Sequence, residues 1–482
     1  MHELAKLAVD TARSRGATFA DVRIMQRRRQ SLDAEDARIA HLSDNADAGF
    51  GVRVLADGAW GFAASGVITR DEMQRVAGRA VEVAKASAKA IGKPVEWAPE
   101  PAAELTFSSP CEIDPFGVSI PEKVELLLGI NAALTKHEGI KKAFGRMALR
   151  RDEKLYVNSD GSVMESDIVM TAVEYSATAV GKGEVKSRAY VPPPRTFGHE
   201  NIDADDLMAS TDRVAQQAIE HLSAKQCPVG RKDLVLDPHN LALTMHESVG
   251  HATELDRALG MEESLAGRSF ATPDLLGNLQ YGAPHVNFVA DNTLHGGLAS
   301  EGFDDDGVPS GKWHIVKDGI FSGYSTGREV AGAIGQERSV GGCRADHWSS
   351  IPIVRIPNLS LMPGDEPLTP EELIASTDDG IYIEGMGSFS IDQMRCNFQF
   401  GGDAFWEIKG GKITGMLKNV TYQSITPDFW NACDAICDER YWVPNGVANC
   451  GKGDPMQIQK MTHGAAPARF RDISVGAAKV GG

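Results

Sequence analysis

Long hydrophobic runs and excess positive charge are both missing from this 482-residue sequence. No stretch of about 18 consecutive apolar residues occurs, and the segment from Met1 to Lys6 shows no basic region leading into an apolar one. The 49 Lys and Arg residues are outnumbered by 66 Asp and Glu residues. The resulting net charge of -17 would repel nucleic-acid phosphates and anionic lipids. We therefore expect a cytoplasmic protein that binds neither nucleic acid nor membranes.

Cysteine is also scarce. The seven cysteines are odd in number and scattered from Cys111 to Cys450, unlike the dense paired framework of a secreted domain. We expect them to be thiols, or a metal ligand among thiols. The remaining composition, with 24% charged and 42% apolar residues, is typical of a folded globular protein, and the chain is long enough for two domains.

Helical patterns and hairpin turns mix in the first half of the chain, whereas strands dominate the second. Apolar residues recur at helical spacing over 3–15, 71–89, 121–136 and 206–222. Dipeptides that favour tight hairpins stand at Asp57-Gly58, Asp160-Gly161, Asp318-Gly319 and Gly410-Gly411. The pattern predicts an α+β fold. We expect an N-terminal domain of mixed helices and hairpin sheet over 1–226, and a strand-rich, antiparallel, barrel-like C-terminal domain over 227–482.

A helix in the second half carries the strongest chemical motif. Asp237 and Pro238 are typical of a capped helix start, and the helix then reads His-Glu-Ser-Val-Gly-His over 246–251. This HExxxH pattern is one residue longer than the HExxH of many zinc proteases. Because five residues turn roughly 140° around an α-helix, His246 and His251 converge only if the helix is distorted. Gly250 is a natural place for a π-bulge or a bend.

If a metal binds there, zinc is the default, since imidazole suits it and a catalytic site needs three protein ligands and one open position. Two histidines are not enough. The third ligand could be Glu254 or a cysteine from the far half of the chain, and spacing does not choose between them. The motif could also arise by chance as surface decoration.

The motif and two later segments resemble the TldD branch of the TldD/TldE (PmbA) family, proteins long called modulators of gyrase and now regarded as zinc metallopeptidases. The resemblance rests on 246–251 with Glu254 and Asp256, on Glu-Gly-Phe-Asp-Asp-Asp-Gly-Val-Pro at 301–309, and on Asn-Cys-Gly-Lys-Gly at 449–453. It spans most of the chain and is strongest in the second half. The TldE branch is similar but lacks HExxxH, so the resemblance implies the catalytic side of the family.

By the family pattern, zinc is held by His246, His251 and Cys450, and Glu247 is the catalytic carboxylate. Zinc in such a site lowers the pKa of water at its open position to about 7 and polarises the scissile carbonyl. Glu247 would act as general base, taking the water proton and passing it to the leaving amine. Glu254 then becomes a candidate for holding an imidazole N–H and fixing its tautomer. The alternative for Glu254 is a solvated helix residue.

We therefore expect a zinc-dependent metallopeptidase that hydrolyses peptide bonds in short or unfolded polypeptides. The resemblance implies a chamber formed by a dimer, either a homodimer or a heterodimer with a TldE-like relative, with the N-terminal domain as chamber wall and dimer surface. A strand-rich domain suits extended peptides, which can add to a sheet edge. The alternative is a non-catalytic peptide-binding or scaffold subunit with a structural metal, which four protein ligands would normally close.

Other residues that could bind a metal or take part in catalysis are not included in the predicted site. The acidic run 304–306 lacks EF-hand spacing and is interpreted as a turn, without a second metal. Cys433 and Cys437 are expected to be buried inert thiols. Arg344 and His347 could donate to an oxyanion, but nothing in the sequence places them beside the metal.

Overall fold

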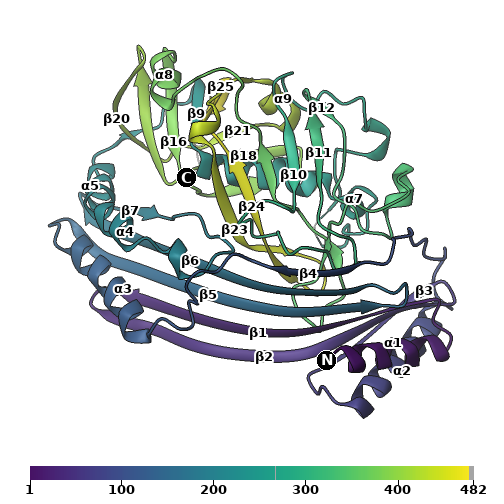
Figure 1. Cartoon of the computed structure of the whole chain (residues 1–482). Coiled ribbons are helices and arrows are strands. Elements are labelled where there is room, and N and C mark those ends of the chain that lie inside the picture. Colours follow the sequence, from purple (N-terminus) through teal and green to yellow (C-terminus); the bar gives the residue numbers. More distant parts are fainter. Residues whose placement is uncertain (266, 477–482) are drawn as a thin grey trace.

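The computed structural model describes residues 1–265 and 267–476. A long curved sheet built from the N-terminal part of the chain underlies the molecule (Figure 1). Its strands follow the order β3-β2-β1-β5-β6-β4, with β7 paired to β6, and all pairs except β4–β6 are antiparallel. The strands are β1 (Phe19–Glu35), β2 (Arg38–Ala56), β3 (Ala59–Ser65), β4 (Glu104–Ser108), β5 (Ile140–Asn158), β6 (Val163–Gly181) and β7 (Glu184–Tyr190).

Helices pack at the two ends of this sheet. The helices α1 (His2–Ser14) and α2 (Arg70–Ser87) share one apolar core with β1, β2 and β3. The helices α3 (Ile120–Thr135), α4 (Ala204–Ala209) and α5 (Thr211–His221) share another with β5 and β6. The first three predicted helices are confirmed. The fourth, over 206–222, is split at Ser210 into α4 and α5.

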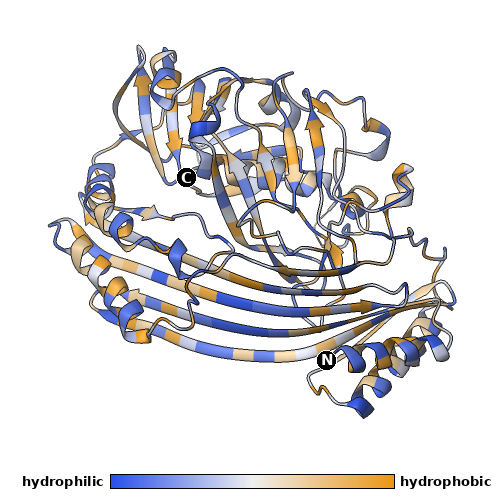
Figure 2. Cartoon of the chain, in the orientation of Figure 1, coloured by the Kyte–Doolittle hydropathy of each residue, from blue (hydrophilic) through white to orange (hydrophobic). Residues whose placement is uncertain are grey.

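Charged residues fill the middle of the long strands, between the two apolar ends (Figure 2). Nearer one end of the sheet, buried charged residues of β2 and β5 meet the acidic run 304–306 from the second half of the chain. Arg53 Nη1 lies 2.8 Å from an Asp306 carboxylate oxygen, and Lys154 Nζ lies 3.0 Å from one of Asp305. All four side chains are buried. The acidic run therefore joins the N-terminal sheet to the rest of the molecule.

The second half of the chain is strand-rich and mostly antiparallel. One sheet has the order β17-β18-β21-β25-β9-β16-β19-β20-β8, with β22 paired to β25, and a smaller one has the order β12-β11-β10-β15-β24-β23. Parallel pairs occur at β9–β16, β15–β24 and β8–β20.

The larger sheet comprises β8 (Lys225–Gln226), β9 (Gly230–Leu236), β16 (Asp379–Glu384), β17 (Phe389–Ile391), β18 (Asn397–Phe400), β19 (Ala404–Lys409), β20 (Lys412–Lys418), β21 (Tyr422–Ile425), β22 (Cys433–Ile436) and β25 (Ala468–Val475). The smaller sheet comprises β10 (Phe288–Asp291), β11 (Lys312–Lys317), β12 (Ile320–Phe321), β15 (Leu359–Leu361), β23 (Val443–Lys452) and β24 (Gln457–Ala465). The strands β13 (Cys343–Arg344) and β14 (Ile353–Val354) pair with each other.

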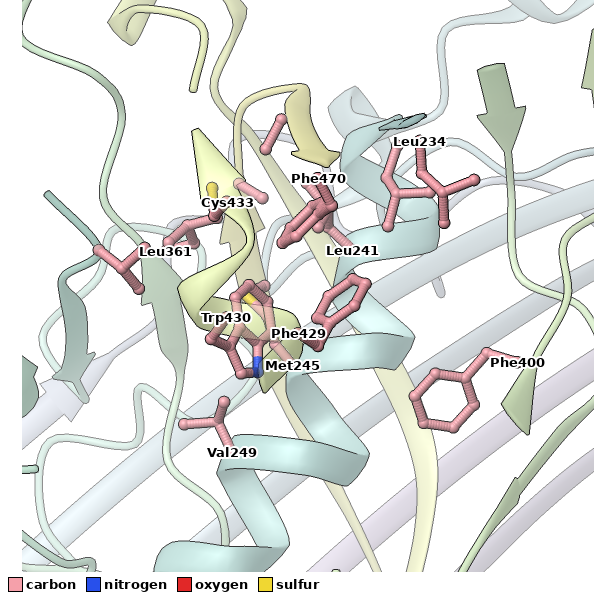
Figure 3. Close-up of a cluster of buried hydrophobic side chains, with 14 of the residues drawn as sticks. Leu234, Leu241, Met245, Val249, Leu361, Phe400, Phe429, Trp430, Cys433 and Phe470 are labelled. Carbon is pink, nitrogen blue, oxygen red and sulfur yellow. The ribbon is translucent and has the colours of Figure 1, made fainter. Parts of the chain in front are cut away.

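The core of this half forms around the helix α6 (Pro238–Met245) (Figure 3). Leu241 and Met245 face Phe429, Trp430 and Phe470 there, and all five side chains are fully buried. Shorter helices complete the described chain: α7 (Leu255–Ala258), α8 (Pro370–Ala375) and α9 (Thr426–Asn431). The predicted α+β class, with a strand-rich, curled C-terminal region, is confirmed. Among the described helices, none combines the length and the apolar character needed to cross a bilayer.

Candidate metal centre

The motif helix begins at a strong cap. The Asp237 carboxylate accepts hydrogen bonds from the backbone amides of Asn240, at 2.7 Å, and Gly385, at 3.0 Å. Pro238 occupies the first helical turn, where its missing N–H costs nothing. The apolar side chains of Leu241, Met245 and Val249 then pack into the core. The packing of these side chains fixes the rotation of the helix that carries His246 and His251.

The predicted distortion of the helix is confirmed. Residues His246–Gly250 form a π-helical turn, followed by a 3₁₀ turn over His251–Thr253. The backbone N–H of His251 donates to the carbonyl of His246, the five-residue hydrogen bond that defines a π turn. The two imidazole centroids are consequently only 4.8 Å apart. A Cβ atom at Gly250 would lie 2.9 Å from the Ile356 side chain, so glycine permits this close packing.

Cys450 joins the two histidines from a distant strand. It lies on β23, which forms the edge of the smaller sheet and departs from regular pairing with β24 between Val447 and Cys450. The Cys450 Sγ atom is 3.4 Å from Nε2 of His251. One donor atom from each of His246, His251 and Cys450 lies within 4.8 Å of the others, and all three residues are buried.

Each of the two imidazoles has a further contact through its Nδ1 atom. His251 Nδ1 lies 2.8 Å from a Glu254 carboxylate oxygen, and His246 Nδ1 lies 2.8 Å from Nε2 of His463 on β24. The carboxylate of Glu254 requires a proton on Nδ1 of His251, which leaves its Nε2 lone pair for a metal. With His463 as acceptor, His246 has the same tautomer. Glu254 is fully buried, not a solvated helix residue. His463 was not predicted, because a single histidine on a strand carries no spacing signal.

Other buried charged residues lie close to Glu254. The Lys452 ammonium lies 3.3 Å from Glu254 and 2.7 Å from Asp256. Burial raises the pKa of Glu254, but Lys452, His251 and Arg257 outweigh it and hold that pKa well below its ordinary value. Glu254 is therefore an anion that can accept the His251 N–H.

The ionisation of the three candidate ligands suits a metal. Burial lowers the pKa of both His246 and His251, which favours neutral imidazoles. Burial raises the pKa of the Cys450 thiol, but His251 and Arg355 outweigh it, so that pKa lies below its ordinary value. Two neutral imidazoles and a thiolate are a donor set that fits zinc. In the described structure no fourth His, Cys, Asp or Glu joins the cluster, and residues 266 and 477–482 contain none of these types.

Glu247 lies in the π turn between the two histidines, and it is ion-paired. Arg395, from the loop between β17 and β18, places Nη1 2.5 Å from Oε2 of Glu247. The pair is largely buried, with side-chain exposures of 14% for Arg395 and 7% for Glu247. Arg395 was not predicted either, since nothing in its local sequence points to the motif helix.

The other candidate residues lie away from this cluster. Cys433 and Cys437 are buried free thiols, as predicted. Arg344 donates to the carbonyls of Lys460 and Ile356 and is used structurally. His347 contacts Asp47 on the N-terminal sheet.

Comparison with known proteins places this site in a class. Profiles of three domains match the chain: PmbA/TldA metallopeptidase domain 1 at residues 20–84, the central domain at 113–225 and the C-terminal domain at 229–477. The class is thus that of the metallopeptidases with this three-part organisation. The chain belongs to the PmbA/TldD family.

Relatives of similar length support this placement. A metalloprotease of Methanocaldococcus jannaschii is 29% identical over 90% of this chain and 92% of its own. A zinc metalloprotease TldD homolog of Saccharolobus solfataricus is 22% identical over 97% and 98%. The crystal structure of TldE from Thermococcus kodakarensis shares the fold, with a TM-score of 0.77 at 17% identity over 98% of this chain and all of that one.

Proposed function

We propose that this protein is a zinc-dependent metallopeptidase that hydrolyses peptide bonds in short or unfolded polypeptides, with Glu247 as general base. The observation that carries the proposal is the convergence of His246, His251 and Cys450, with both Nδ1 atoms already engaged and Glu247 in the same turn. The names of the relatives, metalloprotease and zinc metalloprotease, support it.

Each residue then has a defined task. Zinc, when bound, supplies a Lewis acid that polarises a carbonyl and lowers the pKa of water. His246, His251 and Cys450 would hold it. Glu247 accepts the proton of the attacking water and delivers it to the leaving amine nitrogen. Glu254 and His463 keep the imidazoles in the ligating tautomer.

The edge of β23 supports binding of extended peptides. β23 is the last strand of its sheet, and Ala448 and Asn449, directly before Cys450, are exposed. A cavity of about 450 Å³ opens beside this stretch, and residues of β5 and β6 such as Arg146 and Met170 line its other side. A peptide that pairs with the free edge would pass next to Cys450.

The cavity also supports a division of labour between the two halves. In this proposal residues 227–482 form the metallopeptidase domain, while residues 1–226 provide the chamber wall and the dimer surface. We further propose a cytoplasmic dimer, either of two identical chains or with a TldE-like relative.

The alternative, a scaffold subunit with a structural metal, predicts a closed site. Structural zinc normally has four protein ligands, whereas the cluster offers three donors. A cluster of three donors among the described residues would leave a bound zinc one position for water, which supports the catalytic role.

The test combines metal analysis with peptide cleavage, on the chain alone and together with a TldE-type relative from the same organism. The parent should hold about one zinc per chain, and Cys450→Ser should lose most of it. Glu247→Gln should keep its zinc while cleavage of an unstructured peptide falls at least about 100-fold. Turnover by Glu247→Gln at the parent rate would refute the role of Glu247. A parent without zinc after supplementation would refute the metallopeptidase.

A further inference from the structure

Arg395 brings a positive charge to the candidate centre from the loop between β17 and β18, far along the chain from the motif helix. Its Nη1 contacts only one oxygen of Glu247, Oε2, at 2.5 Å. In the described part of the chain, the other oxygen, Oε1, accepts no hydrogen bond. The guanidinium therefore orients the carboxylate and leaves Oε1 for the water proton.

The loop that carries Arg395 is built to hold it in place. The Asp392 carboxylate accepts hydrogen bonds from the backbone amides of Cys396, at 2.8 Å, and Asn397, at 3.1 Å. The Arg395 amide donates to the Asp392 carbonyl at 3.0 Å, and the Thr426 hydroxyl donates to the Arg395 carbonyl at 2.9 Å. Arg395 itself has a φ of 61°, a left-handed conformation that residues other than glycine adopt uncommonly. An anchored and strained loop is typical of a functional position.

The Arg395 guanidinium has N–H donors that its contact with Glu247 does not use. Arginine carries five N–H donors, and Nε of Arg395 is buried without a hydrogen-bond partner in the described structure. Because Arg395 Nη1 contacts Glu247, which directly follows His246 in the π turn, its positive charge lies close to the candidate ligands. A buried donor without an acceptor is unfavourable unless a ligand supplies one. A peptide carbonyl oxygen at the centre is an acceptor of the right kind.

We propose that Arg395 is a catalytic residue that donates to the scissile carbonyl oxygen as negative charge develops on it. This inference rests on the proposed peptidase function. In the first step the water oxygen bonds to the carbonyl carbon, the carbonyl π pair moves onto the oxygen beside Arg395, and Glu247 takes the water proton. In the second step the oxygen pair re-forms the carbonyl, the C–N bond breaks, and the proton passes from Glu247 to the amine nitrogen. Arg395 stays charged throughout and keeps Glu247 oriented.

The decisive variant is Arg395→Met, which keeps the bulk of the side chain and removes the charge. The matched control is Arg471→Met, the same change at an arginine that is ion-paired with Asp233 and Asp434 and lies outside the metal cluster. We expect kcat on an unstructured peptide to fall about 100- to 1,000-fold in Arg395→Met, with KM changed far less and zinc content equal to the parent. The control should match the parent in all three quantities.

Two further readouts separate catalysis from a structural role. A phosphinic peptide carries a tetrahedral oxyanion, so calorimetry should show that Arg395→Met weakens its binding by a factor similar to the loss in kcat. In Arg395→Ala, millimolar guanidinium should restore part of kcat, whereas equal concentrations of sodium should not. If Arg395→Met folds poorly by circular dichroism, Arg395→Lys with the same phosphinic peptide takes its place, and an intermediate loss is expected because lysine keeps only a point charge.

The outcomes are distinguishable. A parent that cleaves peptides, together with an Arg395→Met variant of equal kcat and equal phosphinic affinity, would overturn the role of Arg395 and leave the metallopeptidase intact. A parent that neither cleaves peptides nor binds the phosphinic peptide would overturn both. A parallel loss of kcat and phosphinic affinity at unchanged zinc content supports the proposal.

Discussion

Replacing His463 by alanine should weaken zinc binding without removing a ligand. His463 is fully buried on β24, and burial, reinforced by His246, holds its pKa well below the ordinary value of histidine. It is therefore neutral near pH 7, and its Nε2, which lies 2.8 Å from Nδ1 of His246, can accept the proton of that atom. Without that acceptor, His246 can turn or change tautomer, and either change costs metal affinity.

The size of the effect follows from the contact that is lost. His246 is only 4% exposed, so water cannot readily replace the missing acceptor. Loss of such an outer partner typically costs about 10- to 100-fold in metal affinity, which corresponds to about 1.4 to 2.7 kcal/mol. The Nδ1–H of His246 would also become a buried donor without an acceptor, which costs about 1–3 kcal/mol, a similar free energy.

The assay is competition for zinc against a chromophoric chelator at pH 7.5, with folding checked by circular dichroism. His463→Gln keeps a side-chain acceptor and should lose less affinity than His463→Ala. His221→Ala is the matched control, because His221 is also buried but lies in α5, outside the cluster. Zinc affinity of His463→Ala equal to that of the parent would show that His463 does not orient His246.

Two further predictions concern stability. Asp306→Ala removes a buried partner of Arg53 at 2.8 Å, and it should lower the free energy of unfolding in urea by roughly 3 kcal/mol. This is the low end of the range for broken buried pairs, because Asp21 still pairs with Arg53. A change below about 1 kcal/mol would contradict the prediction that the acidic run joins the two parts of the chain. Burial raises the pKa of Asp237 to about 6, so the folded state favours the protonated carboxyl. The stability gained from this protonation is fully present below about pH 4 and is lost as the pH rises through 6. Asp237→Asn keeps a capping oxygen without the charge and should raise the thermal midpoint at pH 8 but not at pH 4, and an equal gain at both pH values would refute this assignment.

The sequence by itself determined the features that depend on local spacing. Asp237 and Pro238 marked the helix start, and the separation of His246 from His251 required a distorted helix, which the π turn supplies. The turn dipeptides and apolar periods predicted an α+β fold with a strand-rich second half. These features follow from neighbours within one or two turns of the chain, where backbone geometry leaves few solutions.

Only the tertiary structure decided which distant residues meet those histidines. Cys450 could be named as a ligand by resemblance, but its placement 3.4 Å from His251 depends on how β23 and β24 pair. His463 and Arg395 reach the cluster on a strand and a loop whose sequences carry no periodic signal. Contacts between such segments depend on strand register and on the closure of long chain segments, and no fixed spacing in the sequence records either of these.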